Sequence, residues 1–483
     1  MTRRDLALVA AAFLAYCCFA TFVPPFDDEF YYWCWSESLQ LSYYDHPPMT
    51  AYLIRAATTV FGNTLFAVRL PACVSTAFVL AVVLALSRPK RVAPWLFVTP
   101  LFSFGAVIVT PDTPLLMFWA AYVFWLVKVH ERLDVAARDG GIPLHLWLVG
   151  GLILGCGVLG KYTTGLAVPA GFLAFLLAGR MKSWIAGYVL HGLVAFLVAS
   201  PILIHNIRHD FVPILYQWKH SMGTIDPSVK RFGEFIGVQV VLAGTMPFVL
   251  LPWVLTNWRR LAAEPRLRVC LCLYGFPILF FLYKATRGPL EGNWALASYI
   301  AFWPLAADWY EGARHRPFWR WAMPASFLVP ALAMTYGVIH LVRPLPYPPP
   351  IQDRILRQAE KYELAKRIKA DWDALPEKLP VYTDTYQWVA LLRFCGVDAR
   401  QIDGLTRPSH FTQRREHYTD APRGYLLWDG DPWHLLPENP DRKRLPMDRI
   451  AEPTIVKVYP LHVRGTLVAG YILWRYETIT ATR

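Results

Sequence analysis

Long apolar runs separated by short polar loops are the feature that most constrains this chain. A helix needs roughly 20 apolar residues to cross the hydrocarbon core of a bilayer, and runs of that kind recur as far as Leu341. Charged residues make up only 17% of the chain, whereas about a quarter is usual in soluble domains. We therefore expect a polytopic α-helical membrane protein.

Hydropathy predicts about eleven membrane spans. The first is interpreted as a retained span and not as a cleaved signal peptide, because no small-residue cleavage site precedes Asp27. The predicted spans are residues 6–25, 68–87, 92–109, 114–129, 145–160, 163–179, 184–204, 235–256, 269–283, 294–309 and 321–341.

Basic residues in alternate loops predict the orientation. The positive-inside rule places such loops in the cytoplasm, so the amino terminus is inside, and the loop at 26–67 and everything after Arg343 are outside. Much of the formal net charge of +13 is thereby a topology signal. No nucleic-acid partner is expected, because that would require bases gathered on one folded face. The basic groups are Arg3/Arg4, Arg88/Lys90/Arg91, Arg132/Arg138, Arg180/Lys182, Arg259/Arg260/Arg266/Arg268 and Arg314/Arg316/Arg320.

A change of composition divides the chain into a transmembrane domain at 1–342 and a C-terminal soluble α+β domain at 343–483. The segment RPLPYPPP at 343–350 cannot be helical and is typical of a stiff linker. An amphipathic helix is predicted at 351–370. Strands are predicted at LPVYTD, GYLLWDG, TIVKVYPL and TLVAGYILWRY, the last two as a hairpin. Pairing between Cys34 and Cys395, both outside the predicted spans, is left open.

Acidic and aromatic residues are densest in the first outer loop, whose residues 26–48 have the sequence FDDEFYYWCWSESLQLSYYDHPP. The aromatic residues alone are typical of a membrane interface. Three consecutive acids are harder to explain, because like charges repel one another unless a cation, a base or a substrate uses them. This loop is therefore the first candidate for chemistry.

A set of short motifs in fixed order resembles a known family. They are Asp28-Glu29-x-Tyr31-Tyr32-Trp33, Tyr44-Asp45-His46-Pro47-Pro48-Met49, Val68-Arg69-Leu70-Pro71, Thr110-Pro111-Asp112-Thr113-Pro114-Leu115, Gly160-Lys161-Tyr162-Thr163 and Asn293-Trp294. Together they resemble glycosyltransferase family 39, the protein mannosyltransferase and aminoarabinose transferase clan, which has the GT-C fold. The resemblance implies a bacterial inner-membrane enzyme that takes a sugar from a polyprenyl-phosphate carrier and transfers it to an acceptor at the periplasmic face.

The residues agree with a lipid-linked donor, because no Gly-rich phosphate loop follows a strand and no nucleotide is expected. Direct displacement by an acceptor hydroxyl would invert the anomeric centre. Lipid A, lipopolysaccharide core or another glycolipid is favoured as the acceptor, and a protein hydroxyl is the alternative. A flippase for lipid-linked sugars would place ionisable residues at the middle of its spans, and these are nearly free of acids. A membrane-anchored receptor would leave the first-loop acids unexplained.

The resemblance makes Asp28 the catalytic base. A carboxylate suits this role if burial or its acidic neighbours raise its pKa. The structural alternative is a cap for a helix that begins at Phe30. Asp27 is a second candidate, because the family has one acid fewer before the glutamate. Asp112 is expected to begin a helix with Pro114, and the resemblance also places it in the catalytic cavity.

Asp45-His46-Pro47-Pro48 matches the Glu-Lys-Pro-Pro of the aminoarabinose transferases, in which the acid binds a divalent metal and the lysine contacts the carrier phosphate. His46 is a weaker, pH-dependent cation in that position. The resemblance adds His220 to Asp45 as the ligands of a possible Mg, Mn or Zn ion, a set too sparse for a closed structural zinc centre. The alternatives are a plain turn before a helix at 50–61, an interfacial role for His220 beside Lys219, and the competing histidines His205 and His209.

Lys161 is the leading candidate for the contact to the carrier phosphate. It lies between two apolar runs on the outer side, where basic residues are disfavoured, and lysine binds phosphate well as a point charge. The segment Arg407-Pro408-Ser409-His410-Phe411 is similar to a short motif in related C-terminal tails, with no role assigned. The other substrate-binding candidates are Glu29, His46, Arg55, Arg69, Tyr162, Asn293 and Trp294.

Overall fold

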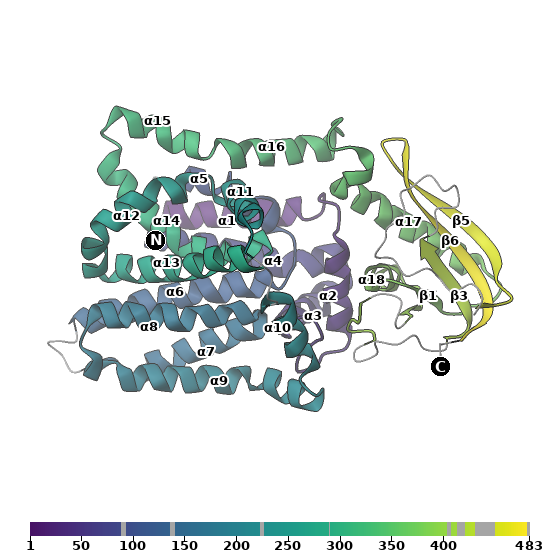
Figure 1. Ribbon diagram of the computed structural model, residues 1–483, viewed down its shortest axis with the longest axis horizontal. Coiled ribbons are helices and arrows are strands. Elements are labelled where there is room, and N and C mark those ends of the chain that lie inside the picture. Colours follow the sequence, from purple (N-terminus) through teal and green to yellow (C-terminus); the bar gives the residue numbers. More distant parts are fainter. Residues whose placement is uncertain are drawn as a thin grey trace.

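The computed structural model describes residues 1–87, 93–135, 141–222, 227–288, 290–402, 407–412, 421–429 and 450–480. Long helices lie side by side in a bundle formed by the residues up to 342, and a mixed sheet lies at one end of it (Figure 1). The bundle helices are α1 (Arg3–Phe19), α4 (Leu65–Leu86), α6 (Asp112–Val135), α7 (Leu144–Gly160), α8 (Ala167–Ala178), α9 (Ile185–Arg208), α10 (Val212–Met222), α11 (Val229–Ala243), α12 (Met246–Ala263), α13 (Pro265–Arg287), α14 (Leu296–Ala313), α15 (Pro317–Ser326) and α16 (Leu328–Val342).

Several of these helices are suited to a bilayer. Within the described residues, five helical segments are long and apolar enough to cross a membrane, and the bent pair α11–α12 adds a sixth candidate. Two shorter segments, α7 and Tyr162–Ala178, are also apolar. The predicted class, a polytopic helical membrane protein, is confirmed, whereas the number of about eleven spans stays a prediction. The five segments are Leu65–Leu86, Asp112–Asp134, Ile185–Arg208, Pro265–Arg287 and Pro317–Val342.

Two of the predicted spans are strongly interrupted or bent. The run at 92–109 contains only the short helix α5 (Ala93–Leu96) and two 3-10 turns, η1 (Pro100–Phe102) and η2 (Phe104–Ala106). Proline has no backbone N–H for a helical hydrogen bond, and Pro100 starts the first of these turns. The run at 235–256 is divided between α11 and α12, which meet at 96°. Gly244, with a φ of 73°, ends α11 in a conformation that favours glycine.

The first outer loop forms two helices, α2 (Asp27–Glu37) and α3 (Met49–Phe61). The helix α2 begins directly after its N-cap residue Phe26, whose backbone N–H donates to Glu29 at 3.0 Å. Asp28 lies inside the first turn and makes no cap hydrogen bond, so the interpretation of Asp28 as a cap for a helix beginning at Phe30 is wrong. The helix expected at 50–61 is present as α3.

The C-terminal part contains a six-stranded sheet with the order β2-β1-β3-β6-β4, in which β5 also pairs with β6. The strand β1 is parallel to both of its neighbours, and the other pairs are antiparallel. The predicted hairpin is confirmed: β5 and β6 are joined at Arg464 and Gly465, which both have positive φ as a tight hairpin turn requires. The elements are α17 (Arg354–Ala374), β1 (Val381–Thr383), α18 (Tyr386–Phe394), β2 (Ala399–Gln401), β3 (Ala421–Asp429), β4 (Ile450–Ala451), β5 (Thr454–Val463) and β6 (Thr466–Ile479).

The helix α2 connects the bundle to the sheet, and it lies beside α18 between them (Figure 1). Its aromatic residues share one hydrophobic core with α17, α18 and the sheet, and Phe30 stacks on Tyr362 with ring centroids 5.5 Å apart. Cys34 and Cys395 both have free thiols, and Cys34 is buried against the carbonyl of Ala390. The C-terminal elements therefore fix the position of α2 through packing.

Candidate active site

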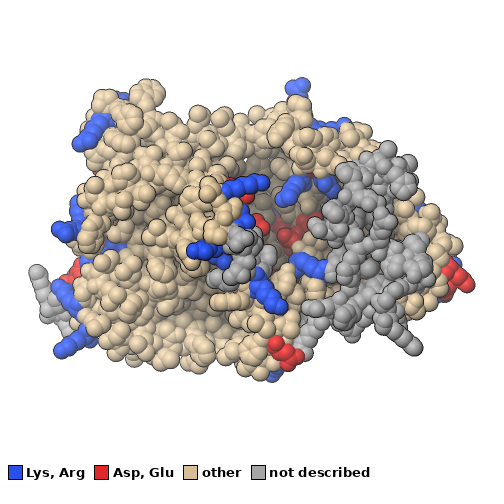
Figure 2. All heavy atoms as spheres, in the orientation of Figure 1, with Lys and Arg blue, Asp and Glu red and all other residues tan. Residues whose placement is uncertain are grey.

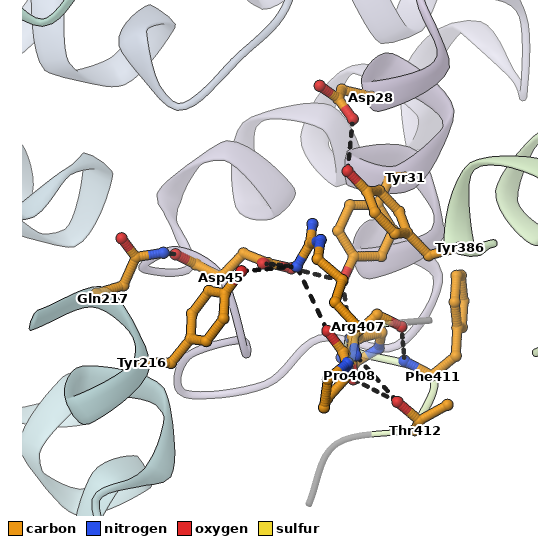
Figure 3. A network of polar contacts seen from close by, with 12 residues as sticks. Asp28, Tyr31, Asp45, Tyr216, Gln217, Tyr386, Arg407, Pro408, Phe411 and Thr412 are labelled. Atoms are coloured by element: carbon orange, nitrogen blue, oxygen red, sulfur yellow. Dashed lines mark hydrogen bonds and ion pairs between the residues drawn. The ribbon is translucent and has the colours of Figure 1, made fainter. Parts of the chain in front are cut away.

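Asp28 lies in the first turn of α2, at the junction between the bundle and the C-terminal elements. Its Oδ1 accepts a hydrogen bond of 3.3 Å from the hydroxyl of Tyr386, the first residue of α18 (Figure 3). Solvent reaches the side chain, yet protein encloses it on most sides, and this loss of hydration raises the pKa of Asp28 above its usual value. The neighbouring charge of Asp27 raises this pKa further. A carboxylate with a raised pKa is suited to act as a base near neutral pH.

Asp27 has a different environment from its neighbour. Its Oδ2 accepts hydrogen bonds from Lys361 at 2.7 Å and from Gln358 at 3.2 Å, both on α17. The Asp27 and Lys361 side chains are both largely buried. Asp28, in contrast, has no ion pair with any residue that the structure describes. The geometry therefore assigns Asp27 to attaching α17 and leaves Asp28 as the carboxylate that a substrate can reach.

Asp45 is the centre of a second set of contacts, between the first outer loop and the C-terminal elements (Figure 3). Its Oδ1 accepts a hydrogen bond of 2.6 Å from Arg407 Nη1, and its Oδ2 accepts one of 2.7 Å from the hydroxyl of Tyr31. Its backbone carbonyl accepts a hydrogen bond from the Gln217 amide on α10. Three segments that are distant in the sequence therefore meet at one buried aspartate.

Arg407 is a site residue to which the motifs assigned no role. Its guanidinium carbon lies 4.3 Å from the ring centroid of Tyr386 and 5.9 Å from that of Tyr216. The next residues of this segment also reach the site, because the backbone N–H of His410 donates to the Tyr31 hydroxyl at 2.7 Å. The only hint of this in the sequence was the similarity of residues 407–411 to related C-terminal tails. In the folded chain, Arg407 of this segment contacts Asp45 directly, and its guanidinium lies over Tyr386, which bonds Asp28.

A second polar cluster lies at the ends of bundle helices. Lys161 Nζ donates to Asp112 Oδ1 at 2.7 Å, and the side-chain amide of Asn293 donates to Asp112 Oδ2 at 2.7 Å. Asp112 is the first residue of α6, as expected for a helix start, but its carboxylate binds these side chains and does not cap the helix. Lys161 and Asp112 are both buried. Asp112 therefore compensates the charge of Lys161, and a contact between Lys161 and a phosphate stays a prediction.

Tyr32 lies close enough to both clusters for their charges to act on it. Burial raises the pKa of its phenol, and the charges of Asp28, Asp45 and Asp112 raise it further. Three carboxylates from different segments therefore act on one buried ring. The space-filling view shows a hollow between the bundle and the C-terminal part, with acidic groups inside it and Lys and Arg around it (Figure 2).

Two cavities adjoin the segment that contains Asn293. One, of about 260 Å³, has a polar side formed by Thr110, Asp112 and Asn293. The other, of about 320 Å³, is lined almost entirely by apolar side chains of α11 to α14. Gln239 lines the apolar cavity and donates to the carbonyl of Gly292 at 3.0 Å, so the two cavities lie on either side of one short turn.

Glu29 and Arg69, predicted to bind substrate, form a closed structural pair instead. Both side chains are fully buried, and Arg69 Nη2 lies 2.6 Å from Glu29 Oε2. The five guanidinium N–H groups of Arg69 are all used, so none is left for a ligand. Arg69 Nε also donates to Glu29, and the remaining donors bind the carbonyl oxygens of Ala20, Val23 and Pro24.

The other predicted substrate residues lie at varying distances from these clusters. Arg55 is exposed on α3 and pairs with Glu37 at 3.3 Å, and none of its described contacts is with the Asp28 or Asp112 network. Tyr162 begins the turn η3 (Tyr162–Leu166) directly after Lys161, and Trp294 follows Asn293 in η5 (Gly292–Ala295). His46 follows Asp45, with its ring centroid 6.4 Å from that of Tyr32.

The metal site expected at Asp45 and His220 stays a prediction. Both carboxylate oxygens of Asp45 are already bound, by Arg407 and Tyr31. Among the described residues, no group of three His, Cys, Asp or Glu side chains is placed to hold a metal ion. His220 is on α10, but its side chain lies outside the described part of the chain. A metal bound by Asp45 would share this carboxylate with Arg407 and Tyr31.

Comparisons with known proteins show which families this chain resembles. Residues 45–205 match the family described as "Dolichyl-phosphate-mannose-protein mannosyltransferase". Lipid A galacturonosyltransferase RgtD of Rhizobium johnstonii is 29% identical over 60% of this chain and 62% of its own length. An undecaprenyl phosphate-alpha-4-amino-4-deoxy-L-arabinose arabinosyl transferase of Pectobacterium carotovorum is 24% identical over 58% of this chain and 52% of its own length. The chain thus spans less than two thirds of the length of these curated relatives.

The fold has a counterpart among solved structures. ArnT from Cupriavidus metallidurans, bound to undecaprenyl phosphate, matches 98% of both chains with a TM-score of 0.62 at 15% identity. The shared fold is that of a helical membrane protein, the GT-C fold that the ordered motifs predicted. The family match and the relatives make this chain similar to the glycosyltransferases of family 39.

Proposed function

We propose that the protein is an integral-membrane glycosyltransferase that moves a sugar from a polyprenyl-phosphate carrier to an acceptor hydroxyl, with inversion. The acceptor is lipid A, lipopolysaccharide core or another glycolipid. The observation that supports this most directly is the environment of Asp28, a carboxylate with a raised pKa and no ion pair among the described residues, beside Tyr386 at the junction between the bundle and the C-terminal part. The names of the related proteins support the same chemistry.

In this mechanism Asp28 takes the proton of the acceptor hydroxyl as the oxygen attacks the anomeric carbon. The bond between that carbon and the phosphate oxygen breaks, and polyprenyl phosphate leaves on the opposite face. General base catalysis of this kind contributes about 10²–10⁴ in rate. The Tyr386 hydroxyl holds the carboxylate in place through its hydrogen bond.

The donor is assigned to the Lys161 side of the hollow. A departing phosphate needs positive charge, and Lys161 supplies it by exchanging its contact with Asp112 for the phosphate. Asp112 and Asn293 then line the pocket for the sugar. The apolar cavity next to this turn has the chemistry to hold the first isoprene units of the carrier.

The proposal includes the finer features of the topology. The protein has about eleven spans in the bacterial inner membrane, and Asp28 and the C-terminal domain face the periplasm, as the loop charges predict. A divalent metal at Asp45 and His220 stays a prediction. Dialysis against EDTA, followed by Mg, Mn or Zn, tests it. An unchanged transfer rate after chelation would rule it out.

The test of the function uses the full chain purified in detergent with a polyprenyl-phospho-sugar and a glycolipid acceptor. Mass spectrometry follows the glycosylated acceptor and free polyprenyl phosphate together. We expect Asp28→Asn to lose transfer by about 10²-fold or more and to retain binding of the carrier lipid. Asp27→Asn is the matched control and should retain most of the transfer, because this carboxylate faces Lys361.

Two outcomes would count against the proposal. Retained turnover in Asp28→Asn would exclude this residue as the base. Failure of the wild type to release polyprenyl phosphate from any donor would favour the flippase alternative, since a flippase moves the lipid without cleaving it.

A further inference from the structure

A cavity of about 770 Å³ lies between α12, α14 and the start of α15. These segments are at the end of the bundle farthest from the sheet (Figure 1). The helix α14 begins directly after the turn that contains Asn293 and has 18 residues, so its other end is about 27 Å further along at 1.5 Å per residue. The proposed reaction therefore makes no use of this cavity.

Part of the lining is aromatic and is formed by Trp253, Trp309 and Trp319. Tryptophan collects where the hydrocarbon of a bilayer meets the lipid headgroups, and this composition is typical of that depth. The rest of the lining is polar and includes arginine and acidic side chains. An acyl chain alone would remove the hydration of these groups without replacing it, whereas a lipid headgroup satisfies both parts of the lining.

The charges around the cavity leave one cation available. Arg260 pairs with Asp308, and Glu311 pairs with Arg314 at 2.9 Å, so both acids of the lining are compensated. Arg316, which directly precedes α15, also lines the cavity and is exposed. Its side chain makes no ion pair or hydrogen bond with any residue that the structure describes. The cavity therefore presents a positive charge to an anion that enters it.

We propose that this cavity binds the headgroup of an anionic phospholipid, with Arg316 contacting the phosphate. A guanidinium has a planar fork of donors that matches phosphate oxygens, and basic pockets between membrane helices bind anionic headgroups in this way. A headgroup with one net negative charge complements the one available cation. The loop charges that predict the orientation place this lipid in the cytoplasmic leaflet.

The competing interpretation is that Arg316 only extends towards water at the membrane surface, without binding a lipid. Such an arginine requires no cavity beside it and attracts anionic lipids no more than its exposed neighbours do. Arg320 is a neighbour of this kind, because it is exposed on α15 and is not part of the cavity lining. It provides the matched control.

Native mass spectrometry of the full chain, stripped of lipid in detergent, tests the role of the charge. The probes are phosphatidylglycerol and phosphatidylcholine with identical acyl chains. The wild type should bind the first phosphatidylglycerol about 10-fold more tightly than phosphatidylcholine. Arg316→Gln should remove this preference, and Arg320→Gln should retain it.

Gly312→Leu tests the role of the space. Gly312 lines the cavity near the end of α14, and a Cβ atom at this position meets no atom within 4 Å. Leucine is also a better helix former than glycine, so the variant should fold. Its side chain would occupy the cavity while every charge stays in place, and binding of phosphatidylglycerol should weaken about 10-fold or more. Thermal unfolding checks that each variant is folded.

Several results would overturn the proposal. They are equal binding of the two lipids by the wild type, an equal loss of preference in Arg320→Gln, and undiminished binding in Gly312→Leu. Displacement of the lipid by inorganic phosphate at similar concentration would show that the ligand is a free anion. A wild-type dimer that Gly312→Leu dissociates would show that a second copy of the chain fills the cavity.

Discussion

Arg69→Gln tests whether the buried pair of Glu29 and Arg69 is structural. In the wild type both side chains are fully buried, and Arg69 attaches α4 to the end of α1 and to α2. The variant leaves the Glu29 carboxylate without its counter-charge in apolar surroundings and leaves buried carbonyl oxygens without donors. Removing one partner of a buried pair costs about 3–5 kcal/mol, a large part of the stability of a typical domain.

Thermal unfolding of the purified protein in detergent, followed by loss of the monodisperse size-exclusion peak, measures this effect. Arg55→Gln is the matched control: its pair with Glu37 is exposed and worth about 0–1 kcal/mol, so the unfolding temperature should hardly change. The double variant Glu29→Gln with Arg69→Gln should recover part of the loss, because no uncompensated charge remains. Wild-type stability of Arg69→Gln together with a raised donor KM would refute the structural assignment.

The remaining predictions concern Asp28 and its neighbours. Asp28 acts in its ionised form, so kcat/KM should fall as the pH drops through the pKa of Asp28, which lies above the ordinary aspartate pKa of about 4. A fall in kcat/KM centred on the ordinary aspartate pKa would contradict this. Tyr386→Phe removes a hydrogen bond that lowers the Asp28 pKa, so the acid limb should move to higher pH. A raised folded-state pKa also means that ionised Asp28 destabilises the folded protein at neutral pH. Asp28→Asn should therefore unfold at a higher temperature than the wild type at pH 7. A lower unfolding temperature would show that the surroundings do not destabilise the ionised carboxylate. Lys161→Met should raise the donor KM while the acceptor KM stays near wild type, as measured by varying each substrate in turn.

The sequence predicted the helical class well, because a bilayer requires long apolar segments and such segments are visible in composition alone. It failed where backbone chemistry overrides composition. At 92–109 the residues are apolar enough for a span, but Pro100 begins a 3-10 turn instead. At 235–256 hydropathy continues through Gly244, where the chain turns by 96°. Hydropathy measures the preference for lipid and gives no information on where a helix must break.

The site was predictable as a set of residues and not as a set of contacts. The ordered motifs selected Asp28, Asp112 and Lys161, and the folded chain pairs Lys161 with Asp112 and places Asp28 beside Tyr386. Position in the sequence could not distinguish Arg69, whose donors are all used internally, from a cation that faces a substrate. It also could not connect Arg407 to Asp45, because a salt bridge between residues 362 positions apart depends on the packing of every element between them.

The division of roles between Asp27 and Asp28 follows from the position of α2. Neighbouring residues on a helix point about 100° apart, so two adjacent carboxylates cannot have the same surroundings. One faces α17 and pairs with Lys361, and the other contacts Tyr386. Both contacts are made by the C-terminal part, which also packs around the aromatic residues of α2. The extra acid that made the first loop ambiguous in sequence is therefore the contact that attaches α17. Burial and the charge of Asp27 raise the pKa of Asp28, while Tyr386 and Arg407 of the C-terminal part lower it.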